Sequence, residues 1–152
     1  MTRLILPAML LALAACGAAD PAATAPSASM EGPDPRMTLQ HWADALENRD
    51  WAAAYDTWSG DGAASGMDAE TYASSYEQYR TIRITLGEGH VEGAAGSLYY
   101  ETGVTMSGET KDGISYRFQG PVTLRRVNDV PGATKEQLEW HIVANGLAPV
   151  EP

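Results

Sequence analysis

Residues 41–59, HWADALENRDWAAAYDTWS, carry the apolar residues of two short helices with only a brief polar break between them. Just upstream, Asp34-Pro35 combines a residue suited to an N-cap with a proline favoured in the first helical turn. The first helix is then expected to bury a single stripe formed by Leu39, Trp42, Ala43 and Leu46. Asn48 can end this helix, so the connection to the second helix must be a sharp corner.

A second and a third helix follow with similar signals. Asp50 can cap the second helix, whose apolar residues recur at positions i, i+3, i+4 and i+7: Trp51, Ala54, Tyr55 and Trp58. A glycine-rich loop spans residues 59–66, after which Asp68 can cap the third helix. An aromatic stripe at helical spacing then comprises Tyr72, Tyr76 and Tyr79. Three N-terminal helices are therefore predicted.

Beyond residue 80 the apolar residues alternate, which is typical of strands with one buried face. The first strand is expected to run to about Glu92, with a bulge at Gly87 and Gly89. After a turn at 93–96, one face of the second strand carries Leu98, Tyr100, Thr102, Val104 and Met106. The turn 111–113 leads to a third strand, which is expected to break and bend at Gly120-Pro121. A loop at 128–134 precedes a final strand marked by Leu138, Trp140, Ile142 and Ala144.

This order of elements predicts an α+β fold in which three N-terminal helices pack on a curved four-stranded antiparallel sheet. The spans 41–59 and 70–87, the latter ETYASSYEQYRTIRITLG, resemble the NTF2-like (cystatin-like) superfamily, in particular the NTF2-like N-terminal domain of some penicillin-binding proteins. The resemblance covers roughly residues 37–146 and implies a cone whose mouth lies between helices and sheet. Because the sequence reaches Pro152 with no transpeptidase region, transpeptidation is not expected. The segment LRRVNDVPG…EQLEWHIV is similar to small lipoproteins of alphaproteobacteria.

The single cysteine lies in LALAACGAAD, residues 11–20, at the end of an apolar run that follows Arg3. This run is too short to cross about 30 Å of hydrocarbon, so it predicts an export signal. The run 13–16, LAAC, resembles the lipobox of bacterial lipoproteins, which implies cleavage before Cys16 and lipid, palmitate included, on that residue. An ordinary signal peptide with an incidental cysteine is the alternative. Because Gly17 follows the cysteine, the sorting rule of enteric bacteria implies an outer-membrane location facing the periplasm.

These signals predict four segments. They are a signal peptide at 1–15, a lipidated Cys16 with a disordered Ala/Pro/Ser tether at 16–35, an NTF2-like domain at 36–148 and a short tail at 149–152. A tether of this composition cannot bury a core, so the folded domain would be held near the membrane but not against it.

The composition and the absence of known motifs limit the kinds of partner and cofactor that the sequence predicts. The 152 residues carry a formal net charge of -10, with no basic cluster beyond Arg125-Arg126, so nucleic acid is not an expected partner. A lipid on Cys16 would leave no free thiol for a disulfide or a nucleophile. The sequence has no HExxH, EF-hand, Walker A or dinucleotide-binding pattern, and no metal or cofactor is predicted.

Acid–base chemistry in such a cone would need histidines, carboxylates and tyrosines. The candidate bases are His41, His90 and His141, the candidate carboxylates are Asp44, Asp56 and Glu101, and the candidate proton donors are Tyr72, Tyr76 and Tyr100. His41 is off the helical stripe and His141 alternates with Trp140, so both are expected to face solvent. Aromatic stripes usually pack the core, but a ligand pocket, if present, would be lined by Trp58, Tyr72, Tyr76, Tyr100 and Trp140.

Three functions stay open at this point. The favoured one is a non-catalytic envelope lipoprotein, anchored through Cys16, whose domain binds an envelope protein or a cell-wall component. The second is a binder of a small hydrophobic ligand. The third is an isomerase- or dehydratase-type enzyme, which requires a buried carboxylate or histidine within hydrogen-bond reach of a tyrosine. A homodimer is a further expectation, formed through an open sheet face that would carry Tyr99, Thr105, Arg117, Thr123, His141 and Val143.

Overall fold

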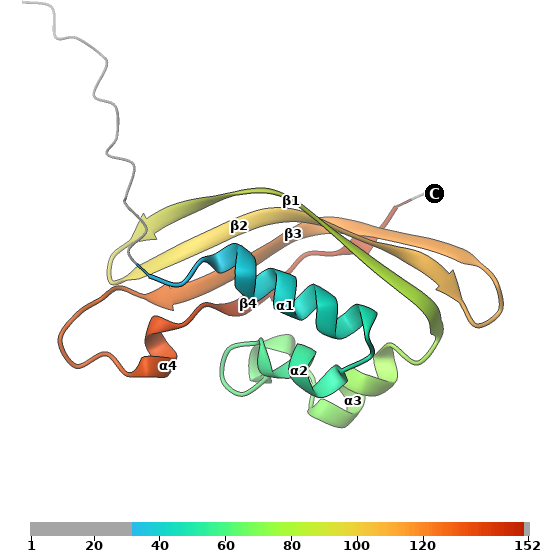
Figure 1. Ribbon diagram of the computed structural model, residues 1–152, viewed down its shortest axis with the longest axis horizontal. Coiled ribbons are helices and arrows are strands. Elements are labelled where there is room, and N and C mark those ends of the chain that lie inside the picture. Colours follow the sequence, from blue (N-terminus) through green and yellow to red (C-terminus); the bar gives the residue numbers. More distant parts are fainter. Residues whose placement is uncertain (1–31, 151–152) are drawn as a thin grey trace, which may run out of the picture.

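The computed structural model describes residues 32–150, which form helices beneath one curved antiparallel sheet (Figure 1). Cys16, the expected signal peptide and most of the expected tether lie outside the described residues, as do residues 151–152. Within the described part, no helix is long and apolar enough to cross a membrane.

Helix α1 (Pro35–Glu47) begins and ends where its sequence signals predict. The side chain of Asp34 accepts a hydrogen bond from the backbone N–H of Arg36 at 2.9 Å, and Pro35 occupies the first turn. The predicted stripe is buried, since Leu39, Trp42, Ala43 and Leu46 all face the core. Asn48 is the C-cap, and Arg49 follows it with a φ of 62°. The chain therefore turns sharply into the next helix, as the short connection requires.

Helices α2 (Trp51–Asp56) and α3 (Ala69–Ser75) flank a 3-10 turn, η1 (Ala63–Ser65). Asp50 caps α2 by accepting from the backbone of Ala53, and Asp68 caps α3 by accepting from the backbone of Thr71. Because the cap of α3 consists of hydrogen bonds to the ionised Asp68 carboxylate, those bonds lower the pKa of Asp68. Both predicted caps are confirmed.

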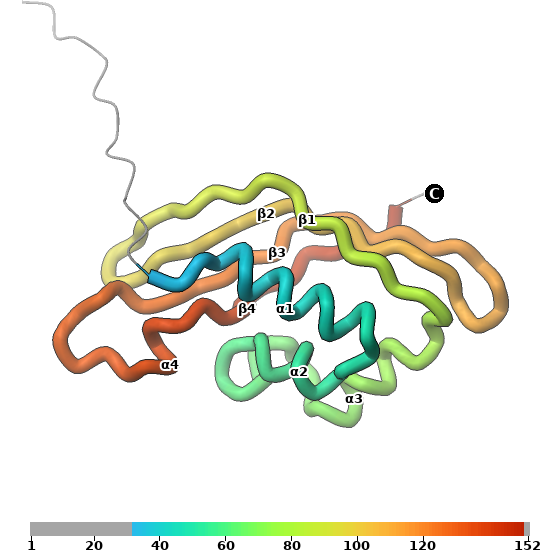
Figure 2. Tube along the Cα trace, viewed as in Figure 1, coloured from blue at the N-terminus to red at the C-terminus, as the bar shows by residue number. Residues whose placement is uncertain are grey.

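The sheet is five-stranded and antiparallel. It contains β1 (Tyr79–Ala94), β2 (Ser97–Thr110), β3 (Ser115–Val127), β4 (His141–Asn145) and the short β5 (Ala148–Pro149). The strands lie in the order β1-β2-β3-β4 (Figure 2). The short β5 follows β4 along the same edge of β3, where it pairs with Phe118 and Gln119. The register of β1 against β2 shifts between Leu86 and Gly89, which confirms the predicted bulge. A Cβ on Gly89 would lie 2.3 Å from the Tyr100 ring, so the bulge needs glycine there.

The core lies between the helices and the concave face of the sheet (Figure 1). Its largest fully buried side chains include Leu39, Trp42, Leu46, Val104, Val122, Leu124 and Ile142. The α+β class, the helices at the N-terminal end and the curved antiparallel sheet are thus as predicted.

The third strand does not break at Gly120-Pro121, contrary to the sequence expectation. The pairing of β3 with β2 runs through this point without a shift, with Pro121 opposite Gly103. The carbonyl of Pro121 accepts from the N–H of Gly146, on the β4 side. Since the nitrogen and oxygen of one strand residue point to the same side, the missing N–H of Pro121 also faces β4, and the β2–β3 ladder loses nothing. The irregularity lies in the neighbouring chain, which turns at Gly146 between β4 and β5.

The final strand is shorter than expected because its predicted first residues form a helix. Helix α4 (Lys135–Leu138) includes Leu138, and β4 begins only at His141. A capping box explains the helix: the side chain of Thr134 accepts from the backbone of Gln137, and the Gln137 side chain accepts from the backbone of Thr134.

Side chains from and just after α1 cover much of the outer edge of β1. Arg36 donates to the carbonyl of Gly87 at 2.8 Å, and Glu47 accepts from the N–H of Ile84 at 2.7 Å. Arg49 donates to the carbonyls of Tyr79 and Arg80. Unpaired strand edges invite pairing with other chains. Here charged side chains bond to four backbone groups of this edge, those of Tyr79, Arg80, Ile84 and Gly87.

The described chain begins at the end of the sheet where the β1–β2 turn lies, far from the β2–β3 hairpin (Figure 2). The indole N–H of Trp140 donates to the carbonyl of Pro33 at 2.7 Å. The buried Arg126 contacts the same region. Its guanidinium lies 5.7 Å from the centroid of the Trp140 ring and is close to Gly32. The first described residues are thus fastened to the core at one end of the domain.

Candidate functional site

The five aromatic residues expected to line a pocket do not lie together. Trp58, Tyr72 and Tyr76 line one cavity of about 280 Å³ between α3 and the β4–β5 segment. Tyr100 is 6% exposed and packs across Gly89 at the bulge. Trp140 is 3% exposed, lies near Pro33 and lines a different groove. We call the first cavity the mouth pocket.

The centre of the cone, behind the mouth pocket, is filled by side chains. The indole N–H groups of Trp42 and Trp58 both donate to the hydroxyl of Tyr72, at 3.2 and 3.3 Å. All three residues are at most 5% exposed. Buried indole and hydroxyl groups need partners, and this arrangement satisfies both indoles with one oxygen. The Tyr72 hydroxyl therefore acts as a structural acceptor in the core.

Tyr76 forms the outer wall of the mouth pocket. Its ring stacks on Trp51, with centroids 5.5 Å apart and planes inclined by 12°, and also contacts the rings of Tyr72 and Tyr79. Burial, reinforced by Tyr72, raises the pKa of Tyr76 far above its usual range. The hydroxyl is therefore neutral at physiological pH and is a hydrogen-bonding group, not a base.

The polar groups of the mouth pocket are mostly committed within the domain. Ser75 donates to the carbonyl of Tyr72 and Ser65 donates to the carbonyl of Met67. The Asn145 side-chain oxygen accepts from the N–H of Leu147, while its amide nitrogen has no partner among the described residues. The pocket thus offers aromatic walls and an amide donor to a small acceptor-bearing ligand. Ser75, Asn145 and Leu147 were not identified from the sequence, although the Asn145-Gly146 dipeptide is a turn signal that could have drawn attention to this segment.

Three of the acid–base candidates meet in a second groove, of about 560 Å³. His41 comes from α1, Asp56 from α2 and His141 from the start of β4, and Glu139 and Trp140 also line this groove. His41 and Asp56 are exposed, so the solvent-facing expectation for His41 is confirmed. No tyrosine lines the groove.

The expectation that His141 faces solvent is wrong. Both of its ring nitrogens are covered and make no hydrogen bond with any described residue. The edge of β4 next to this residue is not open, because the chain at 57–59 lies along it: Ile142 donates to the carbonyl of Thr57, and Ser59 donates to the carbonyl of Ile142. An unpaired buried polar group costs about 1–3 kcal/mol, so we expect His141 to lower the stability of the fold.

The remaining candidates lie apart from both cavities. His90 and Glu101 line a small hollow on the convex face of the sheet, where Glu92 lies 3.5 Å from the His90 ring and Thr123 contacts Glu101. Asp44 is on the exposed side of α1 and accepts from Gln40. Within residues 32–150, no histidine or carboxylate is hydrogen-bonded to a tyrosine hydroxyl, and no group of three His, Cys, Asp or Glu side chains could hold a metal ion.

The sheet face expected to form a dimer is the convex face, turned away from the helices. Strand register places Tyr99 beside Arg125, Thr105 beside Gln119 and Arg117 beside Ser107. Arg125 is in turn opposite His141 on β4, and Val143 lies where the register of β4 shifts. This face is polar and partly exposed.

Comparison with known proteins identifies the fold class. No family model and no curated protein sequence matches the chain. Among solved structures, it is similar to a protein from Novosphingobium aromaticivorans provisionally described as an aromatic ring hydroxylase, with 15% identity, a TM-score of 0.55, and coverage of 76% of this chain and 90% of that one. It is also similar to an NTF2-like superfamily protein from Salmonella enterica, with 10% identity, a TM-score of 0.51, and coverage of 70% and 82%. A conserved protein from Planctomyces limnophilus matches at 13% identity and a TM-score of 0.53, over 76% and 94% of the two chains.

These likenesses define the class of fold. The protein has an α+β, NTF2-like fold in which a curved antiparallel sheet wraps helices to form a cone. At such low identity the similarity carries no activity, and function must be argued from the site.

Proposed function

We propose that this protein is a membrane-anchored envelope lipoprotein whose NTF2-like domain is a non-catalytic binding or interaction module. The lipid would be carried by Cys16, and the following Ala/Pro/Ser segment would tether the domain on the periplasmic side of the outer membrane. The partner would be an envelope protein or a cell-wall component.

The observation that supports the non-catalytic reading most directly is the filled centre of the cone. Catalysis on a small substrate needs an acid or base aimed into a cavity. Here Trp42, Trp58 and Tyr72 close the interior, and the Tyr72 hydroxyl already accepts two indole hydrogen bonds. Tyr76, the phenol at the mouth, has a raised pKa and cannot act as a base at neutral pH.

The mouth pocket supports a second candidate, the binding of a small hydrophobic ligand. Its volume of about 280 Å³ is near the lower end of ligand sites, which commonly measure about 300–1,000 Å³. Aromatic walls from Trp58 and Tyr76 with the amide donor of Asn145 suit a compact ring that carries a carbonyl or hydroxyl acceptor. Such a ligand would be bound without being transformed.

The anchoring is tested by comparing Cys16→Ala with Gly17→Ala in the native host. We expect the wild type and Gly17→Ala to be in the membrane fraction with the mass of an acylated mature chain. Cys16→Ala should lose the acyl mass and leave the membrane fraction. Membrane retention of Cys16→Ala, or an unmodified cysteine in the mature wild type, would overturn the lipoprotein assignment.

The ligand-binding alternative is tested by filling the mouth pocket. Ser75→Trp places a large ring at the pocket wall, and Ser74→Trp is the matched control on the exposed side of α3. A small aromatic carbonyl compound such as acetophenone should raise the melting temperature of the wild type and of Ser74→Trp but not that of Ser75→Trp. Equal responses in all three proteins would exclude binding at the mouth.

A further inference from the structure

Another polar cleft lies at the outer edge of the sheet, beside the first residues of β1. It measures about 690 Å³ and runs between the C-terminal end of α1 and the start of β1. Three arginines line it, Arg49, Arg80 and Arg83, together with Glu47 and Glu109. In a chain with a formal net charge of -10, three guanidinium groups on one cleft reverse the local sign of the surface.

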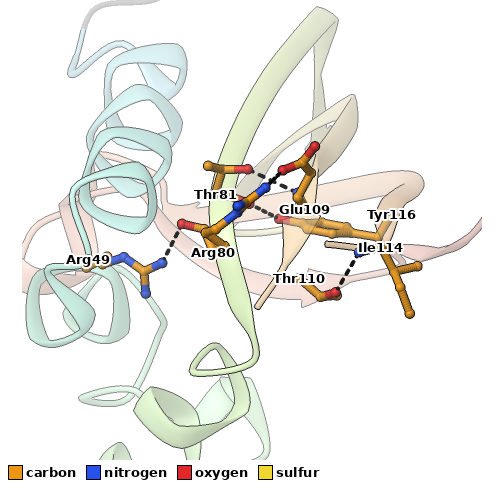
Figure 3. Close-up of polar contacts among 7 residues, drawn as sticks. All are labelled: Arg49, Arg80, Thr81, Glu109, Thr110, Ile114 and Tyr116. Atoms are coloured by element: carbon orange, nitrogen blue, oxygen red, sulfur yellow. Dashed lines mark hydrogen bonds and ion pairs between the residues drawn. The ribbon is translucent and has the colours of Figure 1, made fainter. Parts of the chain in front are cut away.

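Arg49 has an unusual backbone conformation, and its side chain is fixed by several contacts. Its φ of 62° lies in the left-handed region, which a non-glycine residue adopts at a cost of about 1–2 kcal/mol. The guanidinium donates to the carbonyl of Arg80 at 2.8 Å (Figure 3). It also donates to the carbonyl of Tyr79 at 2.5 Å and lies 5.7 Å from the centroid of the Trp51 ring. These contacts use one terminal nitrogen of Arg49, so its remaining N–H groups have no partner among the described residues.

The two carboxylates of the cleft are already engaged. Glu109 forms an ion pair with Arg80, and its backbone N–H donates to Thr81 at 3.0 Å (Figure 3). Glu47 accepts from the N–H of Ile84. Arg83 is exposed and has no side-chain partner among the described residues. Arg83 and the outer part of Arg49 are therefore the groups available to an incoming ligand.

We propose that this cleft binds a partner through carboxylate groups. A guanidinium presents planar, paired N–H donors that match a carboxylate, and such charge-assisted bonds are among the strongest in proteins. The cleft lies at the end of α1 away from Gly32, where the described chain begins (Figure 1), so a ligand reaches it from the side opposite the attachment point. This site deepens the proposed function, because it names the chemistry by which an anchored interaction module would recognise its partner.

The test is a calorimetric titration of the purified full chain with citrate, a tricarboxylate, at low ionic strength. Three variants each remove one positive charge: Arg83→Gln and Arg49→Gln in the cleft, and Arg117→Gln as the control. Arg117 is an exposed residue of β3 outside the cleft. We expect saturable binding at one site, weakened about tenfold by either cleft substitution and less than twofold by Arg117→Gln.

Several results would overturn the proposal. They are an absence of saturable citrate binding, an equal loss in Arg117→Gln, or tighter binding of inorganic phosphate than of citrate. If Arg49→Gln fails to fold, Arg83→Gln decides the question, because its exposed side chain makes no contact that the fold requires. The titration is carried out in solution and is independent of Cys16, so its failure is distinct from a failure of the anchoring experiment.

Discussion

Tyr72→Phe is the substitution that tests most directly whether the centre of the cone is a packed, hydrogen-bonded core. The change removes one oxygen and leaves the ring in place, so little packing is lost. The indole N–H groups of Trp42 and Trp58, which donate to that oxygen at 3.2 and 3.3 Å, would then have no acceptor.

The expected loss of stability follows from the burial of these groups. A buried donor left without a partner costs about 1–3 kcal/mol, so two orphaned indoles predict a loss of roughly 2–6 kcal/mol. Domains of this size are stable by only about 5–15 kcal/mol, so the effect is a large part of the total. Tyr116→Phe is the matched control, because the Tyr116 ring is only partly buried and its hydroxyl donates to a single carbonyl, that of Thr81, at the surface. It should cost about 0.5–1.5 kcal/mol.

Urea unfolding followed by tryptophan fluorescence measures both changes. The midpoint should fall much further for Tyr72→Phe than for Tyr116→Phe, with similar slopes in the two variants. If the two variants differ by less than about 0.5 kcal/mol, the indoles have another acceptor or water reaches them, and the argument for a closed interior fails.

Three further predictions concern other parts of the domain. His141→Phe should stabilise the protein by about 1 kcal/mol in urea unfolding, because it removes two covered nitrogens that have no partner, and a loss of stability would show that they are satisfied. Burial raises the pKa of Tyr116 to about 12 and that of Tyr76 further, so the stability these phenols contribute is complete below pH 10 and falls as the pH rises from 10 through 12. Unfolding measured with absorbance at 295 nm should show this decline, and a flat profile over that range would contradict it. Gly89→Ala should destabilise the fold by about 1–3 kcal/mol in the same assay, since its Cβ would lie 2.3 Å from Tyr100, and a neutral effect would mean that the ring moves freely.

Much of the fold could be predicted because its signals are local. Asp34, Asp50 and Asp68 each cap the helix that follows, and the alternation in β2 matches its buried face. Helix α4 was missed because Leu138 and Trp140 continue the alternation of β4, although Thr134 and Gln137 form a capping box that the sequence also displays. The alternation favours a strand here and the capping box favours a helix. The structure has one turn of helix before the strand begins.

The expected site was harder to predict because it depends on which distant segments become neighbours. Tyr100 and Trp140 are aromatic residues in apolar patterns, as Trp58 and Tyr76 are. They nevertheless lie outside the mouth pocket, where Tyr100 packs against Gly89 and Trp140 contacts Pro33. Likewise, alternation along β4 places His141 opposite Trp140, but it cannot show that the chain at 57–59 covers that edge. Pro121 shows the same limit, because its effect depends on which side of β3 its nitrogen faces.

The side chains of Arg36, Glu47 and Arg49 along the edge of β1 also have a bearing on solubility. Each hydrogen-bonds to a backbone group that could otherwise serve as a template for a strand from another molecule. Copies of a protein held on a surface collide more often than copies in solution. On such a surface, an exposed strand edge with unpaired backbone groups would favour the growth of fibrils. A chain that blocks this growth with its own first helix can be crowded on a surface and remain dispersed.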